Sequence, residues 1–246
     1  MNNRFIKILH LYPKDMNIYG DHGNLLVLSK RAQWLGIQVQ ILDYNQGERF
    51  PTDFDLLIGG GGQDSGQSKV CFDLQRVAGS IKSAVDNGVP MLLVCGLYQL
   101  FGEFFKPIKG STLPGIGVFP FSTVGQKTRM IGNVLARSRE FGDLIGFENH
   151  SGNTVLDRSA VPLAHKILQG YGNNTDRLNE GCRIQNVVGT YLHGSMLPKN
   201  PQIADWMIGK VAQNRGWKLD FSNMQKPQHL DDWTNQARIS AKSRPY

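Results

Sequence analysis

Short apolar runs and helical segments alternate through the first 95 residues of this 246-residue chain. Four apolar runs are typical of buried strands, and they occupy residues 5–11, 37–42, 54–58 and 90–94. Two segments between them place apolar side chains at helical spacing, residues 24–35 and 70–85. Because alternating strands and helices produce parallel strands covered by helices, the sequence predicts an α/β fold with a largely parallel central sheet flanked by helices.

The second half of the chain has a different pattern. Residues 115–124, 128–135 and 182–192 are predicted strands, interrupted by glycine and asparagine, and a helix is predicted over 203–211. After Trp217 the sequence becomes polar and irregular. We therefore expect one domain over residues 1–217, and we interpret residues 218–246 as a polar tail and a candidate arm for docking a partner.

Composition and charge exclude several classes of protein. The net charge is +7, but the cations are spread along the chain, which favours a solubilising surface over a nucleic-acid interface. No apolar run reaches the roughly 18 residues of a membrane span, and the N-terminus lacks a signal-peptide cleavage pattern. We therefore expect a cytoplasmic protein with no transmembrane segment and no nucleic-acid partner.

The three cysteines are too few and too scattered for a disulfide framework or a four-ligand zinc site. Cys95 follows a predicted buried strand and precedes a segment that can begin a helix. A helix N-terminus favours thiolate, and the N–H of Gly96 would point at a reacting carbonyl oxygen. A buried structural cysteine explains this segment equally well, and that is our interpretation of Cys71 and Cys182.

A cysteine nucleophile needs a base within hydrogen-bond reach. His193 ends an apolar run and precedes Gly194, which is where a catalytic base of an α/β enzyme commonly lies. His150 is the rival candidate, and either residue can instead be a loop histidine satisfied by backbone groups. No set of His, Cys and Asp residues has the spacing of metal ligands, so no metal site is expected.

Four consecutive glycines, residues 59–62, follow the third predicted strand. No Gly-Lys-Ser/Thr follows them, and Asp64 and Ser65 break the spacing of a dinucleotide fingerprint. A glycine N–H in this loop, aimed across the sheet edge at Cys95, would instead supply a second donor to an oxyanion.

Several motifs together resemble class I glutamine amidotransferases of the cobyric-acid-synthase-like (CobB/CobQ-type) branch, whose domain is flavodoxin-like. These motifs are Cys95-Gly96-x-Tyr98-Gln99, Gly59–Gly62, Gly146-Phe147-Glu148-Asn149-His150 and Gly189-Thr190-Tyr191-Leu192-His193-Gly194. Within that branch, three segments are similar to glutaminase subunits of bacterial lipid II isoglutaminyl synthases: residues 16–24, 170–174 and 197–200. The resemblance covers about residues 5–216, in matching order.

The resemblance implies hydrolysis of L-glutamine to glutamate and ammonia through a Cys95 thioester. By position, Cys95 is the nucleophile and His193 the general acid/base, and the oxyanion donors are the N–H groups of Gly61 and Gly96. Arg129 matches the arginine that binds substrate glutamine. Gly60, Gln99, Glu148 and His150 are further candidate site residues.

The resemblance also implies a partner. The glutaminase subunits that this chain resembles pass ammonia to an ATP-dependent, Mur-ligase-like synthetase subunit in a heterodimer. That partner amidates the D-glutamate α-carboxyl of the lipid II stem peptide, at the inner face of the membrane, for peptidoglycan synthesis. No cofactor is expected in this chain, and ATP and Mg²⁺ are expected on the partner.

Three positions depart from the wider class: Ser195 stands where many members carry a glutamate that orients the histidine, and Leu93 and Leu97 replace small residues. We expect a carboxylate of the partner, or Glu148, to orient His193. Three alternatives stay open from the sequence: a cobyrinate-type amidotransferase, a cysteine hydrolase with another substrate, and a non-catalytic binding module with the same fold.

Overall fold

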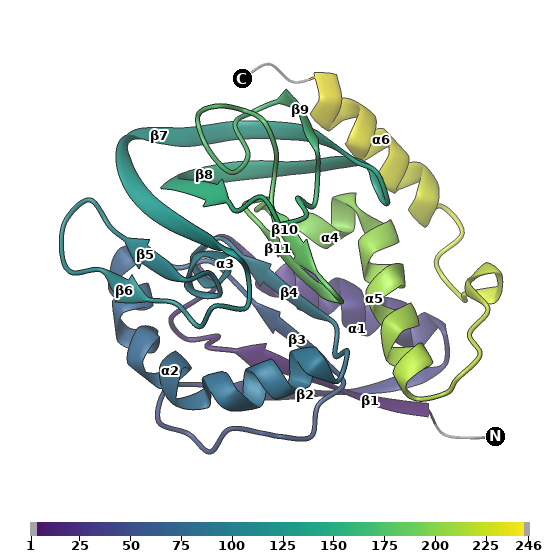
Figure 1. Ribbon diagram of the computed structural model, residues 1–246. Coiled ribbons are helices and arrows are strands. Elements are labelled where there is room, and N and C mark those ends of the chain that lie inside the picture. The colour runs from purple at the N-terminus through teal and green to yellow at the C-terminus, as the bar shows by residue number, and fades with distance from the viewer. Residues whose placement is uncertain (1–3, 244–246) are drawn as a thin grey trace.

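A six-stranded sheet forms the centre of the molecule in the computed structural model, which describes residues 4–243. Its strand order is β10-β11-β4-β3-β1-β2 (Figure 1). All neighbours are parallel except β10 and β11, which pair antiparallel. The strands are β1 (Arg4–Leu11), β2 (Ile37–Tyr44), β3 (Leu56–Gly59), β4 (Met91–Val94), β10 (Cys182–Ile184) and β11 (Val187–Thr190). The predicted α/β fold with a largely parallel sheet is therefore confirmed.

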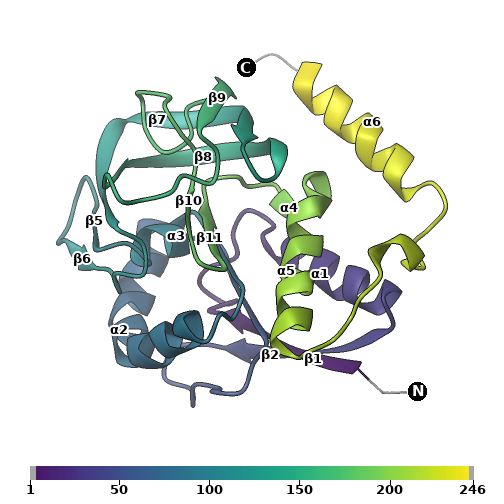
Figure 2. The ribbon, with the colours of Figure 1, turned by 45° about the vertical axis from the view of Figure 1, so that its right-hand side comes forward.

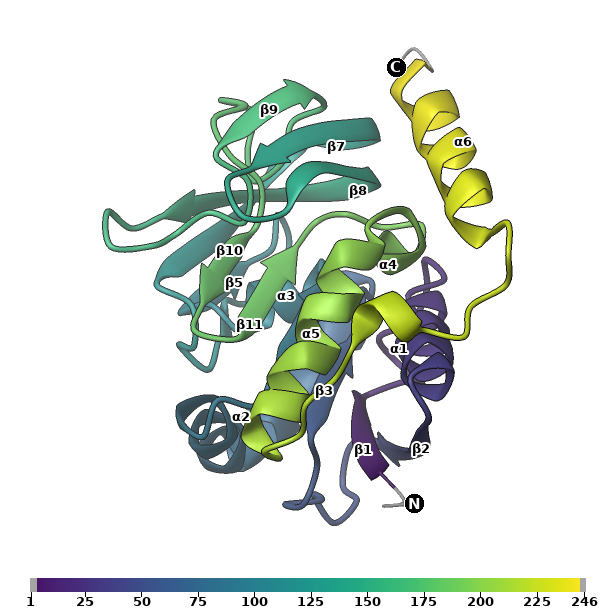
Figure 3. The ribbon, with the colours of Figure 1, turned by 90° about the vertical axis from the view of Figure 1, so that its right-hand side faces the viewer.

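Helices cover both faces of this sheet. The helix α2 (Asp64–Asp86) covers one face, and α1 (His22–Trp34) and α5 (Pro201–Asn214), which contact each other, cover the other (Figure 3). The central strands β3 and β4 are buried over their whole length, as the continuous apolar runs predict. The helices α3 (Gly96–Leu100) and α4 (Met196–Lys199) are single short turns that follow β4 and β11.

A second sheet lies beside the carboxyl end of the first (Figure 1). Its main part is a long antiparallel hairpin of β7 (Phe121–Ser138) and β8 (Gly142–Leu156), whose register shifts between Gly125 and Met130. The short strands β5 (Phe104–Lys106), β6 (Leu113–Pro114) and β9 (Lys166–Gln169) complete the sheet. The buried residue Asn200 precedes α5 and connects this helix to β8. Its side chain accepts a hydrogen bond from Ile145 N and donates one to Ile145 O.

The predictions for the second half need correction. Residues 115–120 form a loop, because the backbone there folds closely against Gly102, whose O lies 2.0 Å from the Cβ that residue 115 would carry. The predicted strand 128–135 is part of the longer β7, and 182–192 divides at a turn into β10 and β11. The strand β8 was not predicted, because its buried face carries Glu148, His150 and Thr154 among its side chains.

The C-terminal tail is not irregular. After a short 3₁₀ turn at Phe221–Asn223 it forms the helix α6 (Leu230–Ser243), which packs along β8 and α4 (Figure 2). Arg238 fastens this helix by donating to the backbone oxygens of Lys199 and Asp143, and Lys242 pairs with the Asp143 carboxylate at 2.8 Å. The last three residues of the predicted tail lie outside the described residues.

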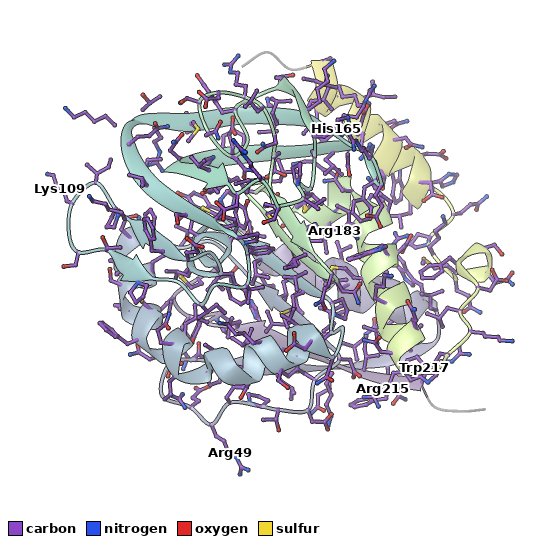
Figure 4. All side chains as sticks on the ribbon, in the orientation of Figure 1. Arg49, Lys109, His165, Arg183, Arg215 and Trp217 are labelled. Atoms are coloured by element: carbon purple, nitrogen blue, oxygen red, sulfur yellow. The ribbon has the colours of Figure 1, made fainter. Side chains whose placement is uncertain are left out.

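Four cationic side chains show how far apart charged groups can lie on this molecule. Arg49, Lys109, Arg183 and Arg215 lie at well-separated places in Figure 4. Over residues 4–243, no helix combines the length and the apolar character needed to cross a bilayer.

We predict that Asn200→Ala destabilises the fold. Asn200 is fully buried, and its side chain makes hydrogen bonds to the N–H and O of Ile145 and to the O of Met196. Losing three buried bonds at about 1 kcal/mol each lowers the free energy of unfolding by about 3 kcal/mol. Urea unfolding measures the change, with the exposed Asn223→Ala as the control; equal stabilities of the two variants would contradict the assignment.

Candidate active site

Cys95 occupies the sharp turn between β4 and α3. Its backbone has φ of +51° and ψ of −102°, a conformation that costs a non-glycine residue about 1–3 kcal/mol. Two hydrogen bonds hold the turn: Cys95 N donates to Thr190 O at 2.8 Å, and Gln99 N donates to Cys95 O at 2.9 Å. Only 5% of Cys95 is exposed, and the residue lines a cavity of about 470 Å³.

His193 lies at the same edge of the sheet as Cys95. It follows β11, which pairs in parallel with β4, so both strands deliver their next residues to the same place. His193 N donates to Phe147 O at 2.7 Å, and the side chain is buried, with its ring centroid 4.6 Å from that of Tyr19. Within residues 4–243 no group completes a well-aligned hydrogen bond with His193 Nε2, and the Cys95 side chain interacts with the ring.

Two neighbours favour the charged form of His193. Burial lowers the pKa of this imidazole, but the Cys95 sulfur and the Asp21 carboxylate outweigh burial and raise it to about 10. A histidine beside a cysteine is the usual base that activates the thiol as a nucleophile. The pair can attack a carbonyl carbon and then donate a proton to the leaving group.

Asp21 is the carboxylate that meets His193, and the sequence did not predict this role. Its Oδ1 lies 3.4 Å from His193 Nδ1, and its Oδ2 accepts a hydrogen bond from Gly61 N at 2.7 Å. Only 3% of Asp21 is exposed. One signal was present in the sequence: Asp21 lies in the segment 16–24 that carried part of the family resemblance.

The backbone of the glycine loop, residues 59–62, packs directly against the residues of the site. A Cβ on Gly60 would lie 2.4 Å from Met16 O, and one on Gly61 would lie 2.7 Å from His193 Cε1 and 3.2 Å from Cys95 Cβ. Gly61 therefore lies beside Cys95 and His193, but its N–H, which was expected to donate to an oxyanion, donates to the Asp21 carboxylate in this structure. Gly96 begins α3 next to the loop, and a Cβ on it would lie 3.1 Å from Gly62 N.

Leu97, which replaces a small residue of the wider class, is accommodated next to the turn at Cys95. It is fully buried, and its Cδ1 lies 2.4 Å from the Cβ that residue 59 would carry. A leucine fits here because the facing residue in β3 is Gly59. Leu93, in the neighbouring strand β4, is equally buried in the core.

Arg129 reaches the mouth of the cavity from the irregular part of β7. Its Nε donates to Asn149 Oδ1 at 2.7 Å, and Nη2 lies 3.5 Å from Tyr19 Oη. Arg129, Asn149 and Tyr19 all line the same cavity as Cys95. The guanidinium is thereby fixed where a carboxylate in the cavity can meet it.

The remaining predicted residues are held by neighbouring groups. His150 is buried, stacks on Tyr191 with centroids 3.5 Å apart, and places its ring nitrogens 3.0 and 3.1 Å from the backbone oxygens of Gly152 and Gly172. Burial lowers the pKa of His150 to about 3.

Glu148 accepts hydrogen bonds from Tyr171 N and Gly172 N, each at 2.8 Å, and burial raises its pKa to about 7. Its carboxylate is thus engaged away from the expected contact with His193.

Gln99 belongs to a buried row of amide and hydroxyl groups behind Cys95. It donates to Tyr191 Oη at 3.1 Å and accepts from Gln67 Nε2 at 2.8 Å. Gln67 lines the cavity and was not predicted from the sequence. Within residues 4–243, no cluster of three or more His, Cys, Asp and Glu side chains could hold a metal ion.

Comparison with known proteins gives concordant results. Residues 7–201 match the family described as the CobB/CobQ-like glutamine amidotransferase domain. The chain is 34% identical over 238 residues to the GatD subunit of lipid II isoglutaminyl synthase (glutamine-hydrolyzing) from Staphylococcus aureus, covering 96% of this chain and 93% of that protein. It is 36% identical over 213 residues to the GatD subunit from Streptococcus pneumoniae, covering 85% and 82%.

A solved structure supports the fold alone. A glutamine amidotransferase from Thermotoga maritima superposes with a TM-score of 0.50 at 15% identity, covering 96% of this chain and 93% of that one.

We predict that Cys95 alkylates before the other two cysteines. Cys71 and Cys182 have no exposed surface, and burial raises the pKa of both thiols, that of Cys182 to about 12. Iodoacetamide at neutral pH should therefore label the peptide that contains Cys95 first, and peptide mapping by mass spectrometry measures the order. Earlier labelling of Cys71 or Cys182 in the folded protein would contradict the site, and Cys95→Ser provides the blank.

Glu180 gives a prediction of pH dependence. It is fully buried, accepts from Thr190 Oγ1 and Tyr191 N, and burial raises its pKa from 4.5 to about 7. Because the folded state binds this proton more tightly, Glu180 stabilises the fold below pH 4.5, and this contribution is lost as the pH rises to about 7. Glu180→Gln should therefore gain stability relative to wild type across that window in urea unfolding, and a pH-independent difference would contradict the assignment.

Proposed function

Because this chain belongs to the CobB/CobQ-like glutamine amidotransferase family, we propose that it is the glutaminase subunit of a lipid II isoglutaminyl synthase. It hydrolyses L-glutamine to L-glutamate and ammonia. The observation that carries the proposal is that Cys95 and Arg129 line one cavity while His193 interacts with Cys95, in a chain that covers 93% of a GatD subunit.

The chemistry follows from the ion pair of Cys95 and His193. The Cys95 thiolate attacks the carbonyl carbon of the side-chain amide, and the carbonyl oxygen becomes an oxyanion. The imidazolium of His193 then donates its proton to the leaving nitrogen, so ammonia departs and a γ-glutamyl thioester remains. His193 next takes a proton from water, the resulting hydroxide attacks the thioester, and glutamate leaves as the thiolate returns.

Backbone N–H groups at the turn stabilise the oxyanion. Gly96 N–H, which follows Cys95 at the first position of α3, is one donor. Gly61 N–H was expected to be the second, but it donates to Asp21 in this structure and is not available to an oxyanion while that bond holds. The close packing of Gly60 against Met16 fixes the loop that carries Gly61. A lost oxyanion donor typically costs 10²- to 10³-fold in kcat.

Arg129 binds the α-carboxylate of glutamine. Its hydrogen bonds to Asn149 and Tyr19 orient the guanidinium and leave other N–H groups for a bidentate contact. Arg129 therefore selects a free amino acid rather than an amide without a nearby carboxylate.

The ammonia passes to a partner. The partner is a Mur-ligase-like synthetase that binds ATP and Mg²⁺ and amidates the D-glutamate α-carboxyl of lipid II, in the cytoplasm at the inner face of the membrane. This chain itself needs no cofactor, because thiolate and imidazole supply the nucleophile and the proton. Residues 218–246 are the candidate docking arm: α6 exposes Trp233 by 59% and Ile239 by 68%, which is apolar surface for a second protein to cover.

We predict that the purified complex with its synthetase partner releases glutamate from glutamine. Cys95→Ala and His193→Ala should each abolish release, because each removes one member of the ion pair. Arg129→Ala should raise KM for glutamine, while Arg137→Ala, on the same strand but paired with Asp143, should not. Coupled detection of glutamate measures all four variants.

Unchanged release by Cys95→Ala would contradict the proposed nucleophile. Equal KM values for Arg129→Ala and wild type would favour a hydrolase that does not recognise the α-carboxylate. Absence of release from the wild-type complex would overturn the glutaminase and favour the non-catalytic module.

A further inference from the structure

We propose that Asp21 is the positioning residue of this site, orienting His193 through Nδ1 and tying it to the glycine loop through the N–H of Gly61. The proposal rests on the proposed function, since it concerns the same cysteine and histidine. From the sequence we expected a carboxylate of the partner, or Glu148, to orient His193. The proposal gives this role to Asp21 of this chain.

The geometry places both oxygens of Asp21 on the site. Oδ1 lies 3.4 Å from His193 Nδ1, and Oδ2 accepts from Gly61 N at 2.7 Å. The carboxylate and the imidazole are both nearly inaccessible, with 3% and 1% of their side chains exposed. A contact in such a buried place is little screened by water, so a charge there acts strongly on the imidazole.

Ser195 holds the segment that carries Asp21. Its hydroxyl donates to Gly20 O at 2.6 Å, and a Cβ on Gly23 would lie 2.1 Å from Ser195 Oγ. Ser195 is the residue that stands where many class I enzymes carry their orienting glutamate. In this chain the same position therefore fixes a neighbouring loop, and the loop delivers the carboxylate in place of that glutamate.

Further contacts fix the loop on both sides of Asp21. His22 N donates to Asn17 Oδ1 at 2.8 Å, and Asn24 Oδ1 accepts from Leu197 N at 2.8 Å. Ile18 N donates to Gly61 O at 3.2 Å, so the loop and the glycine segment pair by backbone as well as through Asp21. These hydrogen bonds fix the position of Asp21 in the protein without a bound substrate.

The other buried carboxylates near the site have different partners. Glu148 accepts from Tyr171 N and Gly172 N, and Glu180 accepts from Thr190 Oγ1 and Tyr191 N. Of the carboxylates in residues 4–243, Asp21 alone lies within 4.0 Å of a nitrogen of His193. Its charge lies beside Nδ1 and stabilises the imidazolium that forms during proton transfer.

Several groups face His193 and set its titration. Asp21 and Tyr19 approach it from the β1–α1 loop, and Cys95 approaches it from the β4–α3 turn. His150 on β8 and Glu180 before β10 interact with it electrostatically from behind. Replacing Asp21 changes one of these groups and leaves the others in place.

The test combines kinetics of the complex with titration of His193 in the isolated chain. Asp21→Asn keeps the size of the side chain and an acceptor for Gly61 N–H, but it removes the charge that faces Nδ1. We expect kcat to fall by roughly 10²- to 10⁴-fold with KM for glutamine nearly unchanged. We also expect ¹⁵N NMR to give a lower pKa for His193, assigned by the loss of its signal in His193→Ala.

Two further variants separate positioning from folding. Asp21→Glu keeps the charge and should retain more kcat and more of the raised pKa than Asp21→Asn. Asp15→Asn alters a carboxylate of the same loop whose ion pair, within residues 4–243, is with the exposed Lys69 at 3.5 Å, and it should leave kcat and the His193 pKa unchanged. Thermal unfolding of each variant controls for stability.

An unchanged His193 pKa in Asp21→Asn would overturn the proposal, as would equal kcat for Asp21→Asn and wild type. If Asp21→Asn does not fold, a wild-type-like pKa in Asp21→Glu supports the proposal and an ordinary pKa overturns it. A wild-type complex without glutaminase activity would instead overturn the proposed function, because the NMR titration does not depend on turnover.

Discussion

The turn at Cys95 is the constraint on which the rest of the site depends. Five parallel strands end at one edge of the sheet, and β4, the strand before Cys95, lies between β3 and β11. The strand β3 therefore delivers the glycine loop from one side and β11 delivers His193 from the other. A positive φ at Cys95 turns the chain sharply into α3, and the hydrogen bond from Cys95 N to Thr190 O ties that turn to β11.

Close packing protects this turn from solvent. Gly59 makes room for Leu97, and Gly61 makes room for the ring of His193, so neither position tolerates a larger residue without displacement. The loop after β1 covers the other side and places Tyr19 and Asp21 against His193. Buried charges in such a place depend on each other for stabilisation, which explains why the pKa of His193 rises although burial alone lowers it.

Much of the fold was predictable because its strands are short, apolar and fully buried. The runs at 5–11, 37–42, 54–58 and 90–94 correspond to β1, β2, β3 and β4, and the sharp turn at Cys95 follows from apolar residues meeting glycine. The hairpin of β7 and β8 was only partly predictable, because its buried face holds Glu148, His150 and Thr154. Those polar groups are tolerated because backbone and side-chain partners satisfy them, and such pairing is a tertiary property.

Asp21 illustrates the same limit within the site. Cys95 and His193 follow buried strands, so their position could be inferred from the strand pattern alone. Asp21 lies in an irregular loop, and its contact with His193 joins residues 172 positions apart. Hydrogen bonds of Ser195, Asn17 and Asn24 set the path of this loop. The side chain that reaches the imidazole can therefore be identified only from the three-dimensional structure.

The central claim is that glutamine is cleaved through a covalent bond to Cys95. The most direct measurement is to mix the complex with isotope-labelled glutamine, stop the reaction with acid within one turnover, and map labelled peptides by mass spectrometry. The account predicts a γ-glutamyl group on the peptide that contains Cys95, which disappears in Cys95→Ala. Release of glutamate with no label on Cys95, or with label on Cys71 or Cys182, would contradict it.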